Sequence, residues 1–93
     1  MVAEAVAAYG AALTVYTKEQ LPQLWAGTQN NLGNVLCEQG ICTGGEAGKE
    51  LIRQAITAYE LALQIRTRDA LPVQWEETMG NLEIAKQALK DMK

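Results

Sequence analysis

The chain has 93 residues, which suffices for one domain with a modest hydrophobic core. Its formal net charge is −3, and its eight basic residues are scattered among eleven acidic ones, which excludes the basic stripe that nucleic-acid binding needs. No apolar run approaches the roughly 20 residues of a membrane-spanning helix, and no charged-then-apolar signal segment opens the chain, so we expect a cytoplasmic protein.

The sequence repeats itself at an offset of 50 residues. Residues 5–34 align with residues 55–84 without a gap and share twelve identities in thirty, with a Trp, a Pro and a Tyr in register. This pattern predicts one domain, 1–93, built from two repeat units at about 1–50 and 51–93. The identical pairs are Ala5/Ala55, Ala8/Ala58, Tyr9/Tyr59, Ala12/Ala62, Leu13/Leu63, Thr17/Thr67, Leu21/Leu71, Pro22/Pro72, Trp25/Trp75, Thr28/Thr78, Asn31/Asn81 and Leu32/Leu82.

Each half is expected to form a helix, a proline turn and a second helix. Apolar residues recur every three or four positions, which predicts four amphipathic helices at about 2–18, 22–39, 47–68 and 72–91. Pro22 and Pro72 should begin the second and fourth helices, because the first turn of a helix does not use the missing N–H. The segment Gly-Ile-Cys-Thr-Gly-Gly at 40–45 is expected to be a loop. The predicted fold class is therefore all-α.

Two segments resemble the tetratricopeptide repeat (TPR) family. The run Asn-Asn-Leu-Gly-Asn at 30–34, followed by Gly40, is similar to the signature of the first helix of a TPR. The run Gln-Ala-Ile-Thr-Ala-Tyr-Glu-Leu-Ala-Leu at 54–63 is similar to the signature of the second helix. The resemblance covers nearly the whole chain. It implies four antiparallel helices in two TPR-like helix pairs, a fragment of an α-solenoid.

The chain departs from the usual TPR in period and in phase. Its period is 50 instead of 34, and its Leu-Pro-x-x-Trp helix starts are similar to arrays common in cyanobacteria and some other bacteria, often joined there to peptidase-like or nucleotide-hydrolysing signalling domains. The chain opens with a second-type helix and closes with a first-type helix, so both outer helices would lack a neighbour. Glu83 stands where the first copy has Gly33, and we expect a looser or solvent-facing seam there.

The family's first-type helices line a concave groove that binds peptides. The resemblance implies a groove on the helices at 22–39 and 72–91, where Asn side chains can both donate to and accept from a ligand backbone. An alternative is that Asn31 and Asn81 bond to the backbone of a neighbouring helix. The basic residues that clamp a C-terminal carboxylate in some members are missing, so we do not expect binding of chaperone tails. The candidate partner-binding residues are Asn30, Asn31, Asn34, Glu38, Gly80, Asn81, Ile84 and Gln87.

The two tryptophans allow two interpretations. Trp25 and Trp75 are candidates for exposed contact residues with a partner. Their place in the apolar stripe favours packing between helices instead.

No residue pattern indicates catalysis, a metal or a cofactor, so we do not expect an enzyme. The chain has no His, its carboxylates are scattered, and Cys37 and Cys42 alone cannot complete a structural zinc site. We expect Cys37 to be a reduced core residue and Cys42 a reduced loop residue; a disulfide between them is the alternative in an oxidising compartment. The run 43–50 lacks the first Gly of a phosphate-binding loop and the Ser or Thr after its Lys.

The expected function is therefore a non-catalytic protein–protein interaction scaffold that binds a partner peptide or domain. The alternative is a self-assembling structural unit, a dimer or higher oligomer formed through the unpaired terminal helices. In that alternative the fourth helix of one copy stacks on the first helix of the next, or two copies close by a two-fold contact or helix exchange. Neither hypothesis involves nucleic acid or a membrane.

Overall fold

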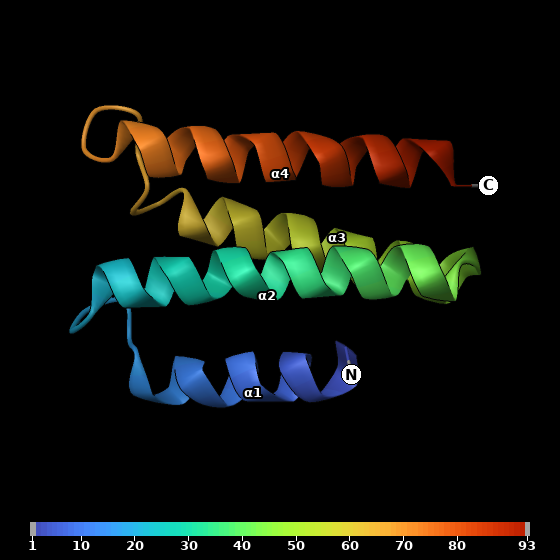
Figure 1. Ribbon diagram of the computed structural model, residues 1–93, viewed down its shortest axis with the longest axis horizontal. Helices are drawn as coiled ribbons and strands as arrows, with labels where there is room; N and C mark the ends of the chain where they lie inside the picture. The colour runs from blue at the N-terminus through green and yellow to red at the C-terminus, as the bar shows by residue number, and fades with distance from the viewer. Residues whose placement is uncertain (1, 93) are drawn as a thin grey trace.

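The computed structural model describes residues 2–92, which form four α-helices and no β-strand. The helices lie alongside one another, and the connections between consecutive helices alternate between the two ends of the molecule (Figure 1). The described chain measures 38 × 27 × 16 Å along its principal axes. The all-helical prediction is confirmed. The helices are α1 (Val2–Val15), α2 (Pro22–Thr43), α3 (Gly45–Ala62) and α4 (Pro72–Asp91).

The hydrophobic core is centred on α3, which packs against both α2 and α4. Tyr59 and Ile52 of α3 are among the largest fully buried side chains. They join Ala55 and residues of the two neighbouring helices, which are Leu36, Cys37, Leu82 and Ala85. Within the described residues α1 packs on α2 alone, on the side away from α4 (Figure 1).

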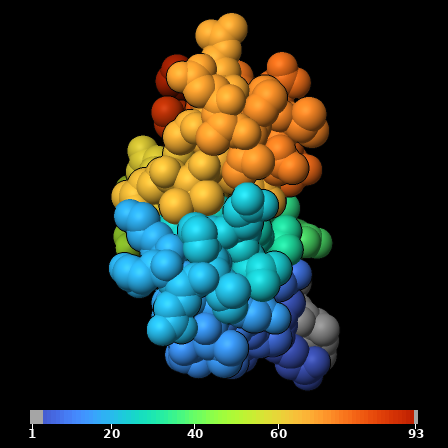
Figure 2. All heavy atoms as spheres, turned by 90° about the vertical axis from the view of Figure 1, so that its left-hand side faces the viewer, coloured from blue at the N-terminus to red at the C-terminus, as the bar shows by residue number. Residues whose placement is uncertain are grey.

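The α1–α2 and α3–α4 connections have the same local structure. In each, a threonine side chain, Thr17 or Thr67, accepts a hydrogen bond at 3.2 Å from the backbone N–H three residues later. Lys18 lies over the ring of Trp25 at 5.8 Å, and its counterpart in the second copy, Arg68, lies 5.7 Å from the centre of the Trp75 ring. Both connections lie at the end of the molecule that Figure 2 presents. Since both tryptophans are half-buried, the packing interpretation is favoured.

These connections also shorten two of the expected helices. The first was expected to reach residue 18 and the third residue 68, but α1 ends at Val15 and α3 ends at Ala62. After Ala62 the backbone tightens, with Gln64 N–H donating to Leu61 O at 3.1 Å. The threonine-centred turn then redirects the chain. Side-chain hydrogen bonds of this kind compete with helical ones, which apolar periodicity does not register.

The expected loop at 40–45 is wrong, because α2 continues to Thr43 and only Gly44 separates it from α3. Gly44 and Gly45 have φ of 68° and 62°, which favours glycine at both positions. Gly40 and Gly48 serve packing instead. A Cβ at Gly40 would lie 2.7 Å from the carbonyl oxygen of Gly48, and a Cβ at Gly48 would collide with the carbonyl oxygen of Gly40. The backbones of α2 and α3 therefore lie close together at this end, and a single residue is enough to connect the two helices.

Candidate protein-binding groove

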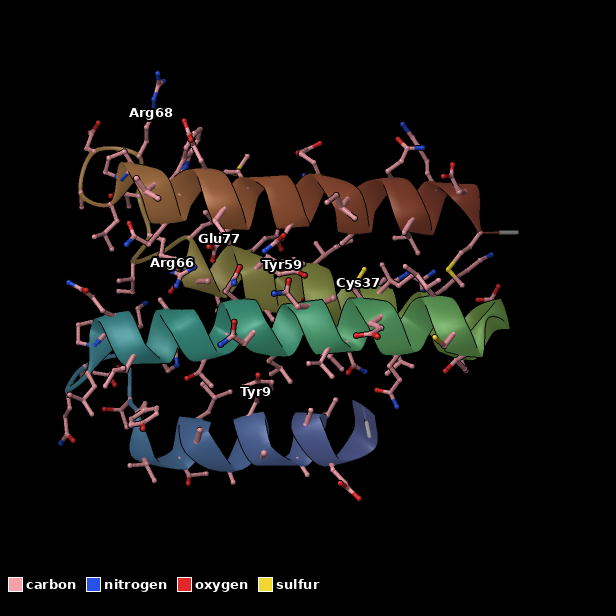
Figure 3. All side chains as sticks on the ribbon, in the orientation of Figure 1. Tyr9, Cys37, Tyr59, Arg66, Arg68 and Glu77 are labelled. Carbon is pink, nitrogen blue, oxygen red and sulfur yellow. The ribbon has the colours of Figure 1, made fainter. Side chains whose placement is uncertain are left out.

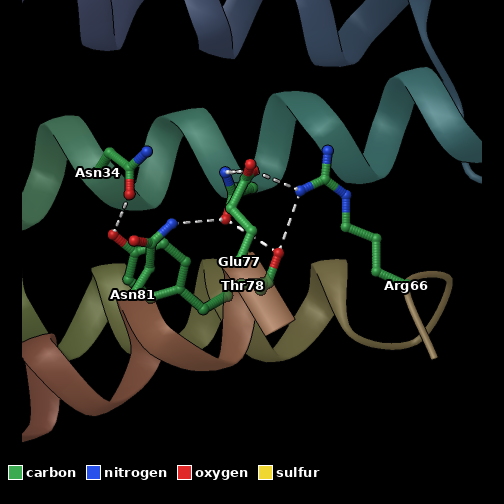
Figure 4. Close-up of polar contacts among 7 residues, drawn as sticks. Asn34, Arg66, Glu77, Thr78 and Asn81 are labelled. Atoms are coloured by element: carbon green, nitrogen blue, oxygen red, sulfur yellow. Dashed lines mark hydrogen bonds and ion pairs between the residues drawn. The ribbon is translucent and has the colours of Figure 1, made fainter. Parts of the chain in front are cut away.

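A buried asparagine connects α2 to α4. Asn30 of α2 is only 2% exposed, and its Oδ1 accepts hydrogen bonds from Thr78 Oγ1 at 3.0 Å and Asn81 Nδ2 at 3.2 Å. Its Nδ2 donates to Glu77 Oε1 at 3.3 Å. Figure 4 shows these contacts. Because water cannot reach Asn30 or Thr78, the bonds satisfy polar groups that would otherwise be costly to bury, and they hold α4 against α2.

Arg66, which follows α3, extends this polar cluster. Its Nη1 donates to Glu77 Oε1 and to Thr78 Oγ1, both at 3.1 Å. Three residues of the cluster occupy positions at which the two copies of the repeat differ. These three residues are far apart in the sequence but lie together in the structure. A comparison of the two copies could therefore have drawn attention to them. The three positions are Asn30/Gly80, Arg66/Tyr16 and Glu77/Gly27.

Next to this cluster, a pocket of about 280 Å³ opens between α2 and α4. Most of its wall is apolar, and among the described residues that line it Glu38 alone is charged. Ile41 and Ile84, one on each helix, are 56% and 63% exposed although both are large hydrophobic residues. The lining residues are Asn34, Cys37, Glu38, Ile41, Cys42, Tyr59, Asn81 and Ile84.

The structure brings together part of the expected groove. Four of the candidate residues line this pocket, namely Asn34, Glu38, Asn81 and Ile84. Asn30 is instead buried in the polar cluster, and Asn31 is exposed outside the pocket. Gln87 lies in a separate hollow of about 250 Å³ on α4, and Gly80 is exposed outside both. The suggested bond of Asn81 to helix backbone is replaced by one to the Asn30 side chain.

Four pocket residues were absent from the expected groove. Ile41 and Cys42 were placed in a loop, but extending the helical period past Gly40 puts Ile41 one turn after Glu38 and on the same side of α2. Cys37 was interpreted as a core residue and is indeed buried, as is Tyr59, yet each also contributes to the pocket wall. The sequence offered no sign that a core side chain would also reach the groove.

Tyr59 forms the base of the pocket because α2 carries a glycine opposite its ring. A Cβ at Gly33 would lie 2.6–2.9 Å from three ring atoms of Tyr59. The Tyr59 hydroxyl crosses to α2 and donates to Asn34 Oδ1 at 2.5 Å. In Figure 3 the Tyr59 and Cys37 side chains both lie in the region where α2, α3 and α4 meet. Burial, and secondly the negative charge that the nearby Cys37 carries when it is ionised, raise the pKa of Tyr59 above its usual range.

Stability should therefore fall in alkaline solution. Burial also raises the pKa of the Cys37 thiol, whereas in the unfolded chain a Cys and a Tyr ionise near about 8.5 and about 10. Their contribution is fully present below these unfolded values and is lost as pH rises through the higher folded ones, because the unfolded state loses its protons first. We expect the free energy of unfolding, measured by urea titration, to decline above about pH 9. Tyr59→Phe should lower stability at neutral pH but flatten the decline; an unchanged slope would contradict this assignment.

The two cysteines differ in environment and are both free thiols in the structure. Cys37 is buried, as expected, whereas Cys42 is exposed on α2 and not in a loop. Five residues along an α-helix span about 7.5 Å, beyond the usual Cα separation of a disulfide. Joining Cys37 to Cys42 would therefore require the last turn of α2 to unwind.

Residues 2–92 contain neither a membrane-spanning helix nor a metal-binding cluster. No described helix combines the length and apolarity needed to cross a bilayer. No cluster of three or more His, Cys, Asp or Glu side chains in this part of the chain is arranged to hold a metal ion. Comparison with protein-family models, curated proteins and solved structures gives no match.

Proposed function

We propose that this chain is a non-catalytic protein-interaction module of the TPR type. Its helices form two antiparallel pairs in a short α-solenoid, and the groove between α2 and α4 holds a segment of a partner protein in the cytoplasm. The observation that carries the proposal is the apolar pocket between α2 and α4, the two helices that resemble first-type TPR helices. The apolar lining of this pocket and the scarcity of reactive side chains favour binding over chemistry.

The pocket suits one large apolar side chain of the partner. Its volume of about 280 Å³ lies just below the roughly 300–1,000 Å³ of sites for small molecules. Ile41 and Ile84 present apolar surface to water on its two sides, and covering such surface contributes about 25 cal/mol per Å². Glu38 at the wall favours a basic residue beside the inserted side chain.

Two asparagines give the same pocket the means to recognise a peptide group. Asn34 accepts from Tyr59 through Oδ1, which leaves its Nδ2 hydrogens to donate to a ligand carbonyl. Asn81 donates through Nδ2 to Asn30, which leaves its Oδ1 to accept from a ligand N–H. The Tyr59 hydroxyl thus orients the Asn34 amide and Asn30 orients the Asn81 amide, so that a partner backbone finds one donor and one acceptor already in place.

A peptide selection tests this function. Peptides selected from a random 12-residue phage library on the wild-type chain should contain an apolar residue next to a basic one. Ile84→Glu should weaken their binding by at least about tenfold, measured by fluorescence anisotropy. Val73→Glu is the matched control, because Val73 is also an exposed branched residue of α4 but does not line the pocket. Selected peptides that bind both variants equally well would refute the groove.

Self-assembly through the terminal helices is the second candidate. It draws support from α1, several of whose residues are more exposed than their counterparts in α3. Stacking of α4 of one copy on α1 of the next is disfavoured. The positions of α4 that match the α3-facing side of α2 carry the exposed, charged residues Glu83, Lys86 and Lys90. Sedimentation that gives the mass of the monomer at every concentration would leave the peptide-binding module as the function.

A further inference from the structure

The two cysteines of the chain line the same pocket from the same helix. Cys37 is 7% exposed, whereas Cys42 is exposed near the end of α2. Burial raises the pKa of the Cys37 thiol, which keeps this thiol protonated and unreactive in the folded chain. An oxidant in solution therefore reacts first with Cys42, at the wall of the groove.

The last turn of α2, residues 40–43, is held in place by few interactions. Its sequence is Gly-Ile-Cys-Thr, and all four residue types have a lower helix propensity than Ala or Leu. Ile41, Cys42 and Thr43 are exposed, so unwinding this turn uncovers little buried apolar surface. Helix ends of this kind open with free energies far below that of global unfolding. We therefore expect this turn to open while the rest of α2 stays helical.

Opening of the last turn would allow the two thiols to meet. In the intact helix Cys37 and Cys42 are separated by about 7.5 Å along the axis, which is too far for a disulfide. Once residues 40–43 leave the helix, the chain can turn back, and Cys42 can reach Cys37 through the pocket that Cys37 lines. A disulfide would then hold this segment inside the pocket, and Ile41 would no longer form its wall.

We propose that a reversible Cys37–Cys42 disulfide closes the groove, a form of regulation that rests on the peptide-binding function proposed above. The oxidant is a small-molecule disulfide such as glutathione disulfide. The Cys42 thiolate attacks one of its sulfurs, which forms a mixed disulfide and releases one thiolate. Cys37 then gives up its proton to solvent and attacks Cys42 Sγ, which displaces the second thiolate. The protein loses two electrons and two protons, and the small disulfide becomes two thiols.

Oxidation and peptide binding should oppose each other. A partner side chain in the pocket occupies the space that residues 40–43 need in the disulfide form, and it packs on Ile41 in the helical form. If the thiol form binds a peptide tenfold more tightly than the disulfide form, saturating peptide shifts the thiol–disulfide equilibrium toward the thiols by the same factor. The partner would thus protect its own binding site from oxidation.

Equilibration of the full-length chain in buffers of reduced and oxidised glutathione tests this proposal. As the oxidised share rises, mass spectrometry should show the loss of two hydrogens with no glutathione adduct. Hydrogen exchange at the amides of residues 41–44 should become faster, and the NMR methyl signals of Ile41 and Ile84 should shift, because both residues line the pocket. Peptides selected on the reduced chain should bind the oxidised chain at least about tenfold more weakly, measured by fluorescence anisotropy.

Two cysteine variants, each compared only with itself in the two buffers, separate the steps. Cys42→Ser should show the same peptide affinity in both buffers, because the buried Cys37 does not react alone. Cys37→Ala should accumulate the glutathione adduct at Cys42, since no second thiol displaces it.

Three results would overturn the proposal. They are a stable glutathione adduct on the wild-type chain, a disulfide between two chains, and an internal disulfide that leaves the isoleucine signals unchanged. If the reduced chain selects no peptide, the proposed function fails, but the mass, the amide exchange and the isoleucine signals still decide whether the disulfide closes the pocket. If peptides bind the reduced and oxidised chains equally well, the binding function stands and its regulation is refuted.

Discussion

Gly48→Ala is expected to destabilise the protein by about 3 kcal/mol, a large share of the roughly 5–14 kcal/mol typical of a chain of 93 residues. The added methyl group would collide with the carbonyl oxygen of Gly40 and lie 3.0 Å from the end of the Met92 side chain. The Met side chain can rotate away, but the Gly40 oxygen belongs to the backbone of α2, so the two helices must separate. Urea unfolding followed by circular dichroism measures the loss.

Two other helical glycines provide the control. A Cβ at Gly10 of α1 or at Gly80 of α4 would meet nothing within 4 Å. Because glycine in a helix is intrinsically less favourable than alanine, Gly10→Ala and Gly80→Ala should each stabilise the chain by up to about 1 kcal/mol. If Gly48→Ala behaves like these two variants, the close approach of α2 and α3 described above is incorrect.

Asn30→Ala should cost about 2 kcal/mol, because it removes the acceptor shared by Thr78 and Asn81. Thr78 is fully buried, so water cannot replace the lost bond. Asn31→Ala, one residue later on the exposed side of α2, should change stability by less than about 0.5 kcal/mol. Chemical denaturation of the two variants gives the comparison directly.

A double-mutant cycle separates the hydrogen bond from the loss of packing. Thr78→Val keeps the shape of the buried side chain while removing its hydroxyl. Combined with Asn30→Ala, it should show a coupling free energy of about 1 kcal/mol. Each single substitution already removes the Thr78–Asn30 bond, so the double variant does not lose it twice. Purely additive effects would show that the Thr78–Asn30 bond contributes nothing to stability.

Much of the fold could be predicted from the sequence, since apolar periodicity determines which segments become helices. The starts of α2 and α4 fall at Pro22 and Pro72 as expected. The repeat aligned Thr17 with Thr67, and the two connections have the same local structure, although both threonines were expected to lie in helices. The turn at 40–45 was mispredicted because glycine has two physical uses. Gly44 supplies a left-handed backbone, but Gly40 lets another backbone approach, and only the position of α3 distinguishes the two.

The candidate groove was only partly predictable, for a related reason. The family resemblance predicts which segments are helices, but not which residues of each turn face the neighbouring helix. Asn30 and Asn31 are adjacent in sequence, yet a rotation of about 100° per residue puts one in the buried cluster and the other in solvent. Arg66 was missed because its role depends on Glu77, which is near it only after α4 folds back.

The single-residue link at Gly44 has a consequence for the order of folding. Closing a loop costs entropy that increases with its length, and the α2–α3 hairpin closes over the shortest connection in the described chain. We therefore expect the contacts around Gly40 and Gly48 to be largely formed in the transition state, with α1 and α4 joining afterwards. The residues that bring α2 and α3 together would then determine how fast the protein folds, whereas those that attach α4 would mainly determine how slowly it unfolds.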